Sequence, residues 1–256
     1  MQILKPITWY TYAFMLNLTL REFDSVRVNF EKEENRAPFF DMSTGLLKRG
    51  LKNEAFVLLL ATWNFASFRY AVNKFELNKF GQSVEDFTSI ISDIKDMQFL
   101  DNNFLTMPES SFAKIAEAFD VLQEYKVNNE GKINPVIGLT GASKLMHLLY
   151  PDLFIIWDGY IRGEKSEDAY SEVELTLLKS GWVLRKYPRN GEGYVCFLKQ
   201  MKKDFGHLVP DYAANHSDKP FTKAIDEVNY MGITKHLQDA EKEKERKKKM
   251  GKKNYQ

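Results

Sequence analysis

The sequence predicts a mainly α-helical protein with little or no sheet, folded as one compact multi-helix domain. Apolar residues recur at three- and four-residue steps through most of the 256 residues, as in helices that bury one face. A chain of this length can bury enough apolar surface to fold without disulfide or metal crosslinks. The alternation typical of a strand is limited to residues 26–30, a stretch too short to set the fold class. We find no internal repeat, which argues against a solenoid.

Individual helices can be placed from their apolar spacing and from their ends. A long central helix is expected from Asn53 to about Lys79, because apolar residues recur there without Gly or Pro. Ser83 is expected to cap the next helix through its hydroxyl, and another helix follows Pro108. Further helices are expected at residues 138–150, 171–182 and about 193–203. Loops rich in Asn and Gly are expected at residues 101–103 and 128–134.

The distribution of charge separates an acidic body from a basic end. Lys and Arg number 36 and Asp and Glu number 35 in the whole chain, yet residues 241–256 carry eight basic and three acidic side chains. We expect residues 1–239 to form a single helical domain, in which any division into two lobes falls near residues 128–135. Residues 240–256 are expected to be a disordered or frayed tail. Its Lys247, Lys248 and Lys249 can follow a nucleic-acid backbone, or can act only as a solvated charge run.

Composition excludes several classes of protein. The single cysteine, Cys196, cannot form an intramolecular disulfide, a Cys-based zinc site or an iron–sulfur cluster. The four histidines share no metal-ligand spacing, so we expect no metal and no other cofactor. The N-terminal segment lacks the features of a signal peptide, and no apolar run approaches the roughly 20 residues that span a bilayer. These observations predict a cytoplasmic protein without a membrane partner, and they leave the oligomeric state open.

One segment, residues 136–162, concentrates residues of chemical interest. Gly138, Gly141 and Ser143 belong to a small-residue turn that leads into a helix at Lys144. Glycines in such a turn let backbone N–H groups approach a phosphate, and the start of a helix adds partial positive charge there. An apolar stretch follows, and Asp158 then stands at the expected start of another helix.

This arrangement resembles the helix–hairpin–helix DNA glycosylase superfamily, in which a Gly-rich hairpin leads into a helix that carries a lysine and an aspartate follows at the next helix start. The resemblance covers about 27 of the 256 residues. It implies a helix–hairpin–helix glycosylase-like fold and DNA as the partner. It also implies that Lys144 attacks the sugar and forms a Schiff base, while Asp158 stabilises positive charge on the sugar and moves a proton. The lone cysteine excludes the branch of this superfamily that binds an iron–sulfur cluster.

Contacts to DNA can be assigned on the same basis. Gly138, Gly141, Ser143 and Arg162 are the expected phosphate-binding residues of this segment. An enzyme that acts on a base must take it out of the duplex, so aromatic side chains near the segment are candidates for stacking on an extruded base. These candidates are Trp157, Tyr160 and Trp63.

A structural interpretation accounts for the same residues without catalysis. Asp158 can cap a helix and pair with Arg162, Lys144 can lie at the surface of a buried helix, and Trp157 can belong to the core. The chain would then be a non-catalytic helical module that binds nucleic acid or another protein. Lys144 Nζ and Asp158 pointing into one cleft, a few ångströms apart and beside an aromatic pocket, would favour the enzyme, whereas divergence onto opposite helix faces would favour the module.

Overall fold

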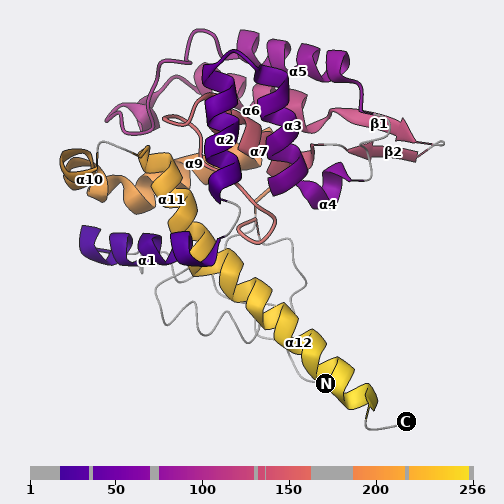
Figure 1. Ribbon diagram of the computed structural model, residues 1–256. Coiled ribbons are helices and arrows are strands. Elements are labelled where there is room, and N and C mark those ends of the chain that lie inside the picture. The colour runs from indigo at the N-terminus through magenta and orange to yellow at the C-terminus, as the bar shows by residue number, and fades with distance from the viewer. Residues whose placement is uncertain are drawn as a thin grey trace, which may run out of the picture.

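The computed structural model describes residues 18–34, 37–69, 75–129, 132–135, 137–162, 187–216 and 219–253. These residues form a compact, mainly helical domain (Figure 1), which confirms the predicted fold class. The sheet in this part of the chain is one antiparallel hairpin, β1 (Lys126–Asn129) and β2 (Lys132–Pro135), in which Lys126 pairs with Pro135. This hairpin stands where we expected a loop and any boundary between two lobes.

Helix α7 (Gly138–Leu149) lies at the centre of the fold (Figure 1). All its residues from Gly141 to Leu148 are buried. A helix that is buried all round needs neighbours on every side. Packed against α7 are α2 (Ala37–Lys48), α3 (Lys52–Trp63) and α6 (Glu109–Gln123). The helices on either side of the β-hairpin, α6 and α7, therefore contact each other directly.

The remaining helices surround this centre. Helices α5 (Leu77–Ile90) and α9 (Gly191–Phe205) pack on α6. Helix α11 (Phe221–Asn229) packs against α1 (Leu20–Glu33) and α10 (Val209–Asn215), and it continues through a π-helical turn, η4 (Tyr230–Thr234), into α12 (Lys235–Lys253). The short elements are α4 (Phe65–Phe68), η2 (Phe104–Thr106) and η3 (Gly206–Leu208).

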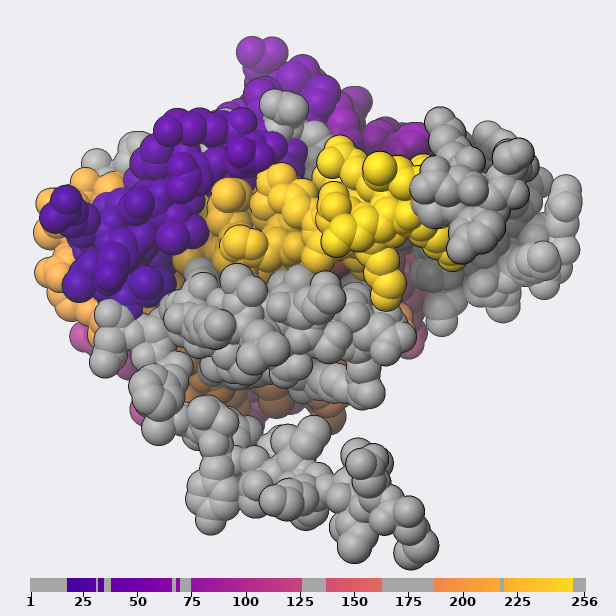
Figure 2. Space-filling view, turned by 90° about the horizontal axis from the view of Figure 1, so that it is seen from below, coloured from indigo at the N-terminus to yellow at the C-terminus, as the bar shows by residue number. Residues whose placement is uncertain are grey.

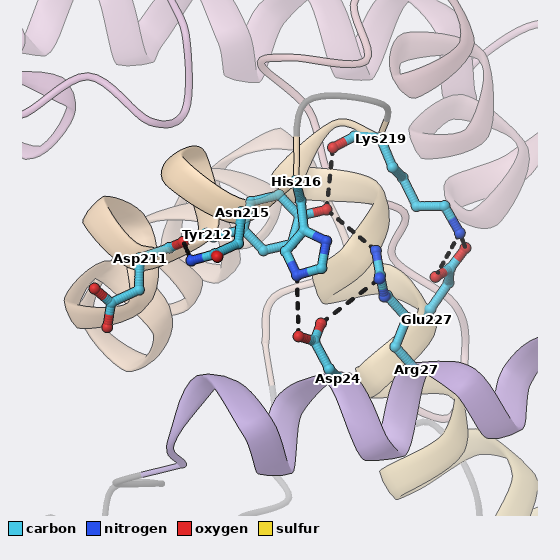
Figure 3. Close-up of polar contacts among 8 residues, drawn as sticks. All are labelled: Asp24, Arg27, Asp211, Tyr212, Asn215, His216, Lys219 and Glu227. Atoms are coloured by element: carbon cyan, nitrogen blue, oxygen red, sulfur yellow. Dashed lines mark hydrogen bonds and ion pairs between the residues drawn. The ribbon is translucent and has the colours of Figure 1, made fainter.

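A polar network attaches α1 to the neighbouring helices (Figure 3). Asp24 accepts a hydrogen bond from the His216 ring at 3.0 Å and lies 3.6 Å from the Arg27 guanidinium. Arg27 donates to the Tyr212 hydroxyl, which in turn donates to the Lys219 carbonyl oxygen. Because α1 also buries Phe23 and Phe30, the helix is held by apolar packing and polar contacts together.

The expected helix from Asn53 to Lys79 is interrupted, so this prediction was wrong in its length. Helix α3 ends at Trp63, where the Asn64 side chain turns away to donate to the Ile137 carbonyl oxygen at 2.9 Å. The next long helix, α5, begins at Leu77. Ser83 therefore lies inside α5 rather than at its cap, and its hydroxyl donates to the Lys79 carbonyl oxygen.

The stretch expected to be extended, residues 26–30, belongs to helix α1. Thr19 and Glu22 form a capping box at the start of this helix, with each side chain accepting from the backbone N–H of the other. Phe23 and Phe30 are seven residues apart and both buried, which is a helical period. The alternation of Val26, Val28 and Phe30 was misleading because Val28 faces solvent.

Other expectations were met. The helices after Pro108, at residues 138–150 and at about 193–203 correspond to α6, α7 and α9. The expected helix at residues 171–182 lies outside the described residues. The segment from residue 240, expected to be a disordered or frayed tail, belongs to α12 as far as Lys253, and this helix projects from the body (Figure 1).

Candidate active site

A cavity of about 900 Å³ brings together residues that the sequence singled out. Lys144 from α7 lines it, and so do Asp158, Tyr160 and Arg162 from the turn at residues 156–162. Trp63, at the end of α3, contributes another wall. The volume lies in the range of small-molecule binding sites. Lys144 and Asp158 thus line the same cavity.

Lys144 is held near the end of α3. Its side chain is buried, its Nζ donates to the carbonyl oxygen of Trp63, and the same atom lies 5.7 Å from the centre of the Trp63 indole ring. The expectation that Lys144 lies at the surface is therefore wrong. A lysine in such a place has few possible orientations, because burial and the carbonyl contact restrict its long side chain.

Asp158 is oriented by three hydrogen bonds. Its Oδ1 accepts from the backbone N–H groups of Tyr160 and Ile161 at 2.8 and 2.9 Å. Its Oδ2 accepts from the hydroxyl of Thr234 at 2.6 Å. The first two contacts are those of a capping residue, as the sequence suggested, although the structure describes only a turn after Asp158, up to residue 162.

Arg162 is buried, and its guanidinium contacts the core. Its guanidinium donates to the Thr140 hydroxyl at 3.1 Å and to the Trp157 carbonyl oxygen, and it lies 5.2 Å from the centre of the Trp157 ring. Arg162 still lines the cavity. Through these contacts, Arg162 attaches the turn that contains Asp158 to the first turn of α7.

The glycines and Ser143 do not form a hairpin turn before Lys144, because α7 already begins at Gly138. A Cβ on Gly141 would lie 2.8 Å from both Asn64 Nδ2 and Ile137 Cγ2. Ser143 is fully buried, and its hydroxyl accepts from the Trp157 N–H at 3.0 Å. The prediction that Gly141 and Ser143 bind phosphate was therefore wrong. These two residues pack α7 against its neighbours.

Gly138 differs from the two buried positions. Its φ of +60° is a conformation that L side chains rarely adopt, and it lines the cavity. Among the three residues of the expected phosphate-binding turn, Gly138 is therefore the one that lines the cavity.

The aromatic candidates divide into two groups. Trp157 is fully buried in an aromatic cluster, and its ring lies 5.7 Å from that of Phe197 in a stacked arrangement. No face of Trp157 is open to a base, so that prediction was wrong. Trp63 and Tyr160 are half-buried and line the cavity. Phe65 lines it as well and is 55% exposed.

Several residues of the cavity could not be predicted from a sequence pattern. Thr234 and Asp226 lie in the C-terminal third, and Lys223 stands behind the cavity with its Nζ 2.7 Å from Asp226 and 5.1 Å from the centre of the Trp63 ring. Thr234 belongs to the π-helical turn η4. Such turns are rare and frequent at functional sites, but no spacing rule locates them in a sequence.

A charged cluster supports the cavity from α11. Glu227 is buried and lies 2.9 Å from Lys219 and 3.8 Å from Lys223 (Figure 3 shows the Lys219 contact). Burial raises the pKa of Glu227, while Lys223 and Lys219 act in the opposite direction. The two lysines thereby provide the partners that a buried carboxylate requires.

Helix α12 leads from the cavity to the basic residues of the C-terminal segment. Gln238 of α12 lines it, whereas Lys247, Lys248 and Lys249 lie further along the same helix and are exposed. From below, α12 and α1 occupy the same face of the molecule (Figure 2).

Among the described residues, no cluster of His, Cys, Asp and Glu is arranged to hold a metal ion. In the same ranges, every helix is too short or too polar to cross a bilayer.

Comparison with known proteins gives no relative: no family model, curated protein or solved structure matches this chain.

Proposed function

We propose that the protein is a DNA glycosylase/lyase that acts at the cavity lined by Lys144 and Asp158. The observation that carries this proposal is that these two residues, on different elements, line one cavity beside the half-buried aromatic side chains Trp63 and Tyr160. The resemblance of residues 136–162 to helix–hairpin–helix glycosylases implies these two residues for the chemistry. A cavity of about 900 Å³ is large enough to accept an extruded nucleotide.

In the proposed reaction, the neutral amine of Lys144 attacks the sugar carbon C1′. The new bond joins Nζ to C1′, and the bond between C1′ and the base breaks, so that the base leaves with the bonding electron pair and gains a proton. Nζ then loses a proton and forms a double bond to C1′ as the ring oxygen leaves and is protonated. The product is a protonated Schiff base on an opened sugar.

Asp158 is suited to stabilise positive charge on the sugar during base departure. Its three donors, the N–H groups of Tyr160 and Ile161 and the hydroxyl of Thr234, hold the carboxylate in one orientation. A preorganised charge needs no rearrangement when the sugar becomes positive. The same contacts favour this role over proton transfer, for which a carboxylate must be free to accept and release a proton.

Borohydride trapping tests the proposal. Duplex DNA that carries an abasic or oxidised-base site should give a covalent protein–DNA adduct, because borohydride reduces the Schiff base to a stable amine. Lys144→Met should abolish the adduct. Lys202→Met is the matched control, because Lys202 is another buried lysine whose Nζ donates to a backbone carbonyl, that of Phe99, but it lies outside the cavity. An adduct that survives Lys144→Met removes Lys144 from the role.

A second candidate function is non-catalytic binding of nucleic acid, favoured by the exposed basic residues of α12. In that case Lys144 and Asp158 keep their hydrogen bonds as structural groups. Duplex binding with no adduct on any damaged substrate would favour this function and contradict the first.

A further inference from the structure

Helix α12 connects the cavity to a strongly basic surface without a break. Thr234, just before this helix, and Gln238 within it line the cavity, and the helix then continues to Lys253. Glu241 accepts a hydrogen bond at 2.8 Å from the hydroxyl of Tyr160, which belongs to the turn that carries Asp158. The hydrogen bond between Tyr160 and Glu241 therefore holds α12 in one position and one direction at the wall of the cavity.

The outer part of α12 is predominantly cationic. Residues 242–249 are all exposed and include six basic residues against Glu243 and Glu245. Lys247 lies 3.9 Å from Glu243, and Lys242 lies 3.7 Å from Asp239. Such exposed pairs contribute little, and their cations remain available to another anion. This segment, residues 242–253, is called the basic arm below.

We propose that the basic arm is a rigid phosphate-binding element that contacts only one flank of the DNA around the nucleotide held in the cavity. The inference rests on the proposed function, because it takes the cavity as the position of the target nucleotide. A flexible tail could follow either flank, whereas a helix anchored through Glu241 points in one direction. Basic side chains on such an arm would neutralise phosphates without reading sequence.

The helix sets the distances. Lys242 and Lys249 stand four and eleven residues beyond Gln238. At about 1.5 Å of rise per residue, their Cα atoms lie about 6 Å and about 17 Å along the axis from the cavity wall. If the arm runs along the duplex axis, where base pairs are spaced by about 3.4 Å, it should cover roughly the second to the fifth base pair on one side of the target.

The test uses two duplexes that contain a stable abasic-site analogue. One has about three base pairs on the 5′ side and about twelve on the 3′ side, and the other reverses these lengths. Fluorescence anisotropy at low salt should show the full-length protein binding one duplex about fivefold or more tightly than the other. Equal affinity for the two duplexes would overturn the inference.

Two variants of the full-length chain separate charge from rigidity. Replacement of Lys244, Arg246, Lys248 and Lys249 by Gln should remove the preference and flatten the salt dependence of binding, because fewer counterions are released. Insertion of three glycines after Lys242 retains every charge but frees the arm from its anchor. This second variant should keep much of the salt dependence and lose the preference. A preference that survives the insertion would show that the arm does not act as a rigid element.

Failure of this inference can be distinguished from failure of the proposed function. A trapped adduct together with equal binding of the two duplexes would retain the enzyme and reject the rigid arm. A clear preference without an adduct on any damaged DNA would retain the arm and reject the lyase.

Discussion

His147 should make the protein sensitive to mild acid, since the histidine is fully buried in α7. Its Nδ1 contacts the Phe154 carbonyl oxygen at 2.6 Å, and a carbonyl oxygen can only accept, so Nδ1 carries the ring proton. Nε2 has no hydrogen-bond partner within the described ranges. Burial, and secondarily the charge of Lys223, lowers the pKa of His147 from 6.5 to about 3.

The sign and size of the effect follow from linkage. Between pH 6.5 and about 3 the unfolded chain binds a proton at His147 that the folded protein does not bind, so the free energy of unfolding falls as the pH falls. From pH 7 to pH 5 this one residue should remove about 2 kcal/mol. The loss should reach about 4 kcal/mol at pH 3, a large fraction of the stability of an ordinary domain.

Urea unfolding at pH 7 and pH 5 measures this effect. His147→Asn keeps an N–H donor near the Phe154 carbonyl oxygen but cannot titrate, so its unfolding free energy should change by about 2 kcal/mol less over this interval than that of the wild type. His236→Asn is the matched control for the substitution itself, because His236 is exposed on α12. Equal pH dependence in His147→Asn and the wild type would refute the assignment of a buried neutral imidazole.

Two further predictions concern the packing and hydrogen bonding of the cavity walls. Gly141→Ala should lower the free energy of unfolding by about 1–3 kcal/mol, because the new Cβ would lie 2.8 Å from both Asn64 Nδ2 and Ile137 Cγ2. Gly45→Ala is the control: its Cβ would meet nothing within 4 Å, so the same thermal or urea titration should show a neutral or slightly stabilising effect. Thr234→Val should lower the free energy of unfolding by about 1.5–3 kcal/mol, because it removes the hydroxyl that donates to Asp158. Thr234→Ser keeps a hydroxyl and should retain most of that stability. Equal unfolding free energies for the two variants would contradict the role of the hydroxyl.

The sequence predicted those parts of the fold that local signals determine. Helix α6 follows Pro108, and α7 stops before Pro151, because proline limits where a helix can begin or continue. The end of α3 could not be predicted in this way. There Asn64 donates to Ile137, 73 residues later in the chain, and no pattern within residues 53–79 indicates that partner.

The candidate site shows the same division. Lys144 and Asp158 lie within one short segment, and a local motif was enough to single them out as candidates. Thr234 lies 76 residues after Asp158, in an element that no periodicity predicts, and it was missed. Gly141, Ser143 and Trp157 were assigned to DNA because small and aromatic residues suit that role, yet the same residue types suit close helix packing.

The pH sensitivity of the core and the chemistry of the site are linked through α7. His147 stands three residues after Lys144, one turn along the same helix. Lys223 is near both residues: its charge disfavours a cation at His147, and its Nζ and that of Lys144 both lie near the Trp63 ring. Lys223 is compensated by Asp226 and Glu227, but a protonated His147 would add a cation whose Nε2 has no partner among the described residues. Acidification should therefore destabilise the helix that positions the Lys144 amine. Loss of borohydride trapping below about pH 5 should accordingly follow the unfolding of wild-type protein, and His147→Asn should shift both transitions together to lower pH.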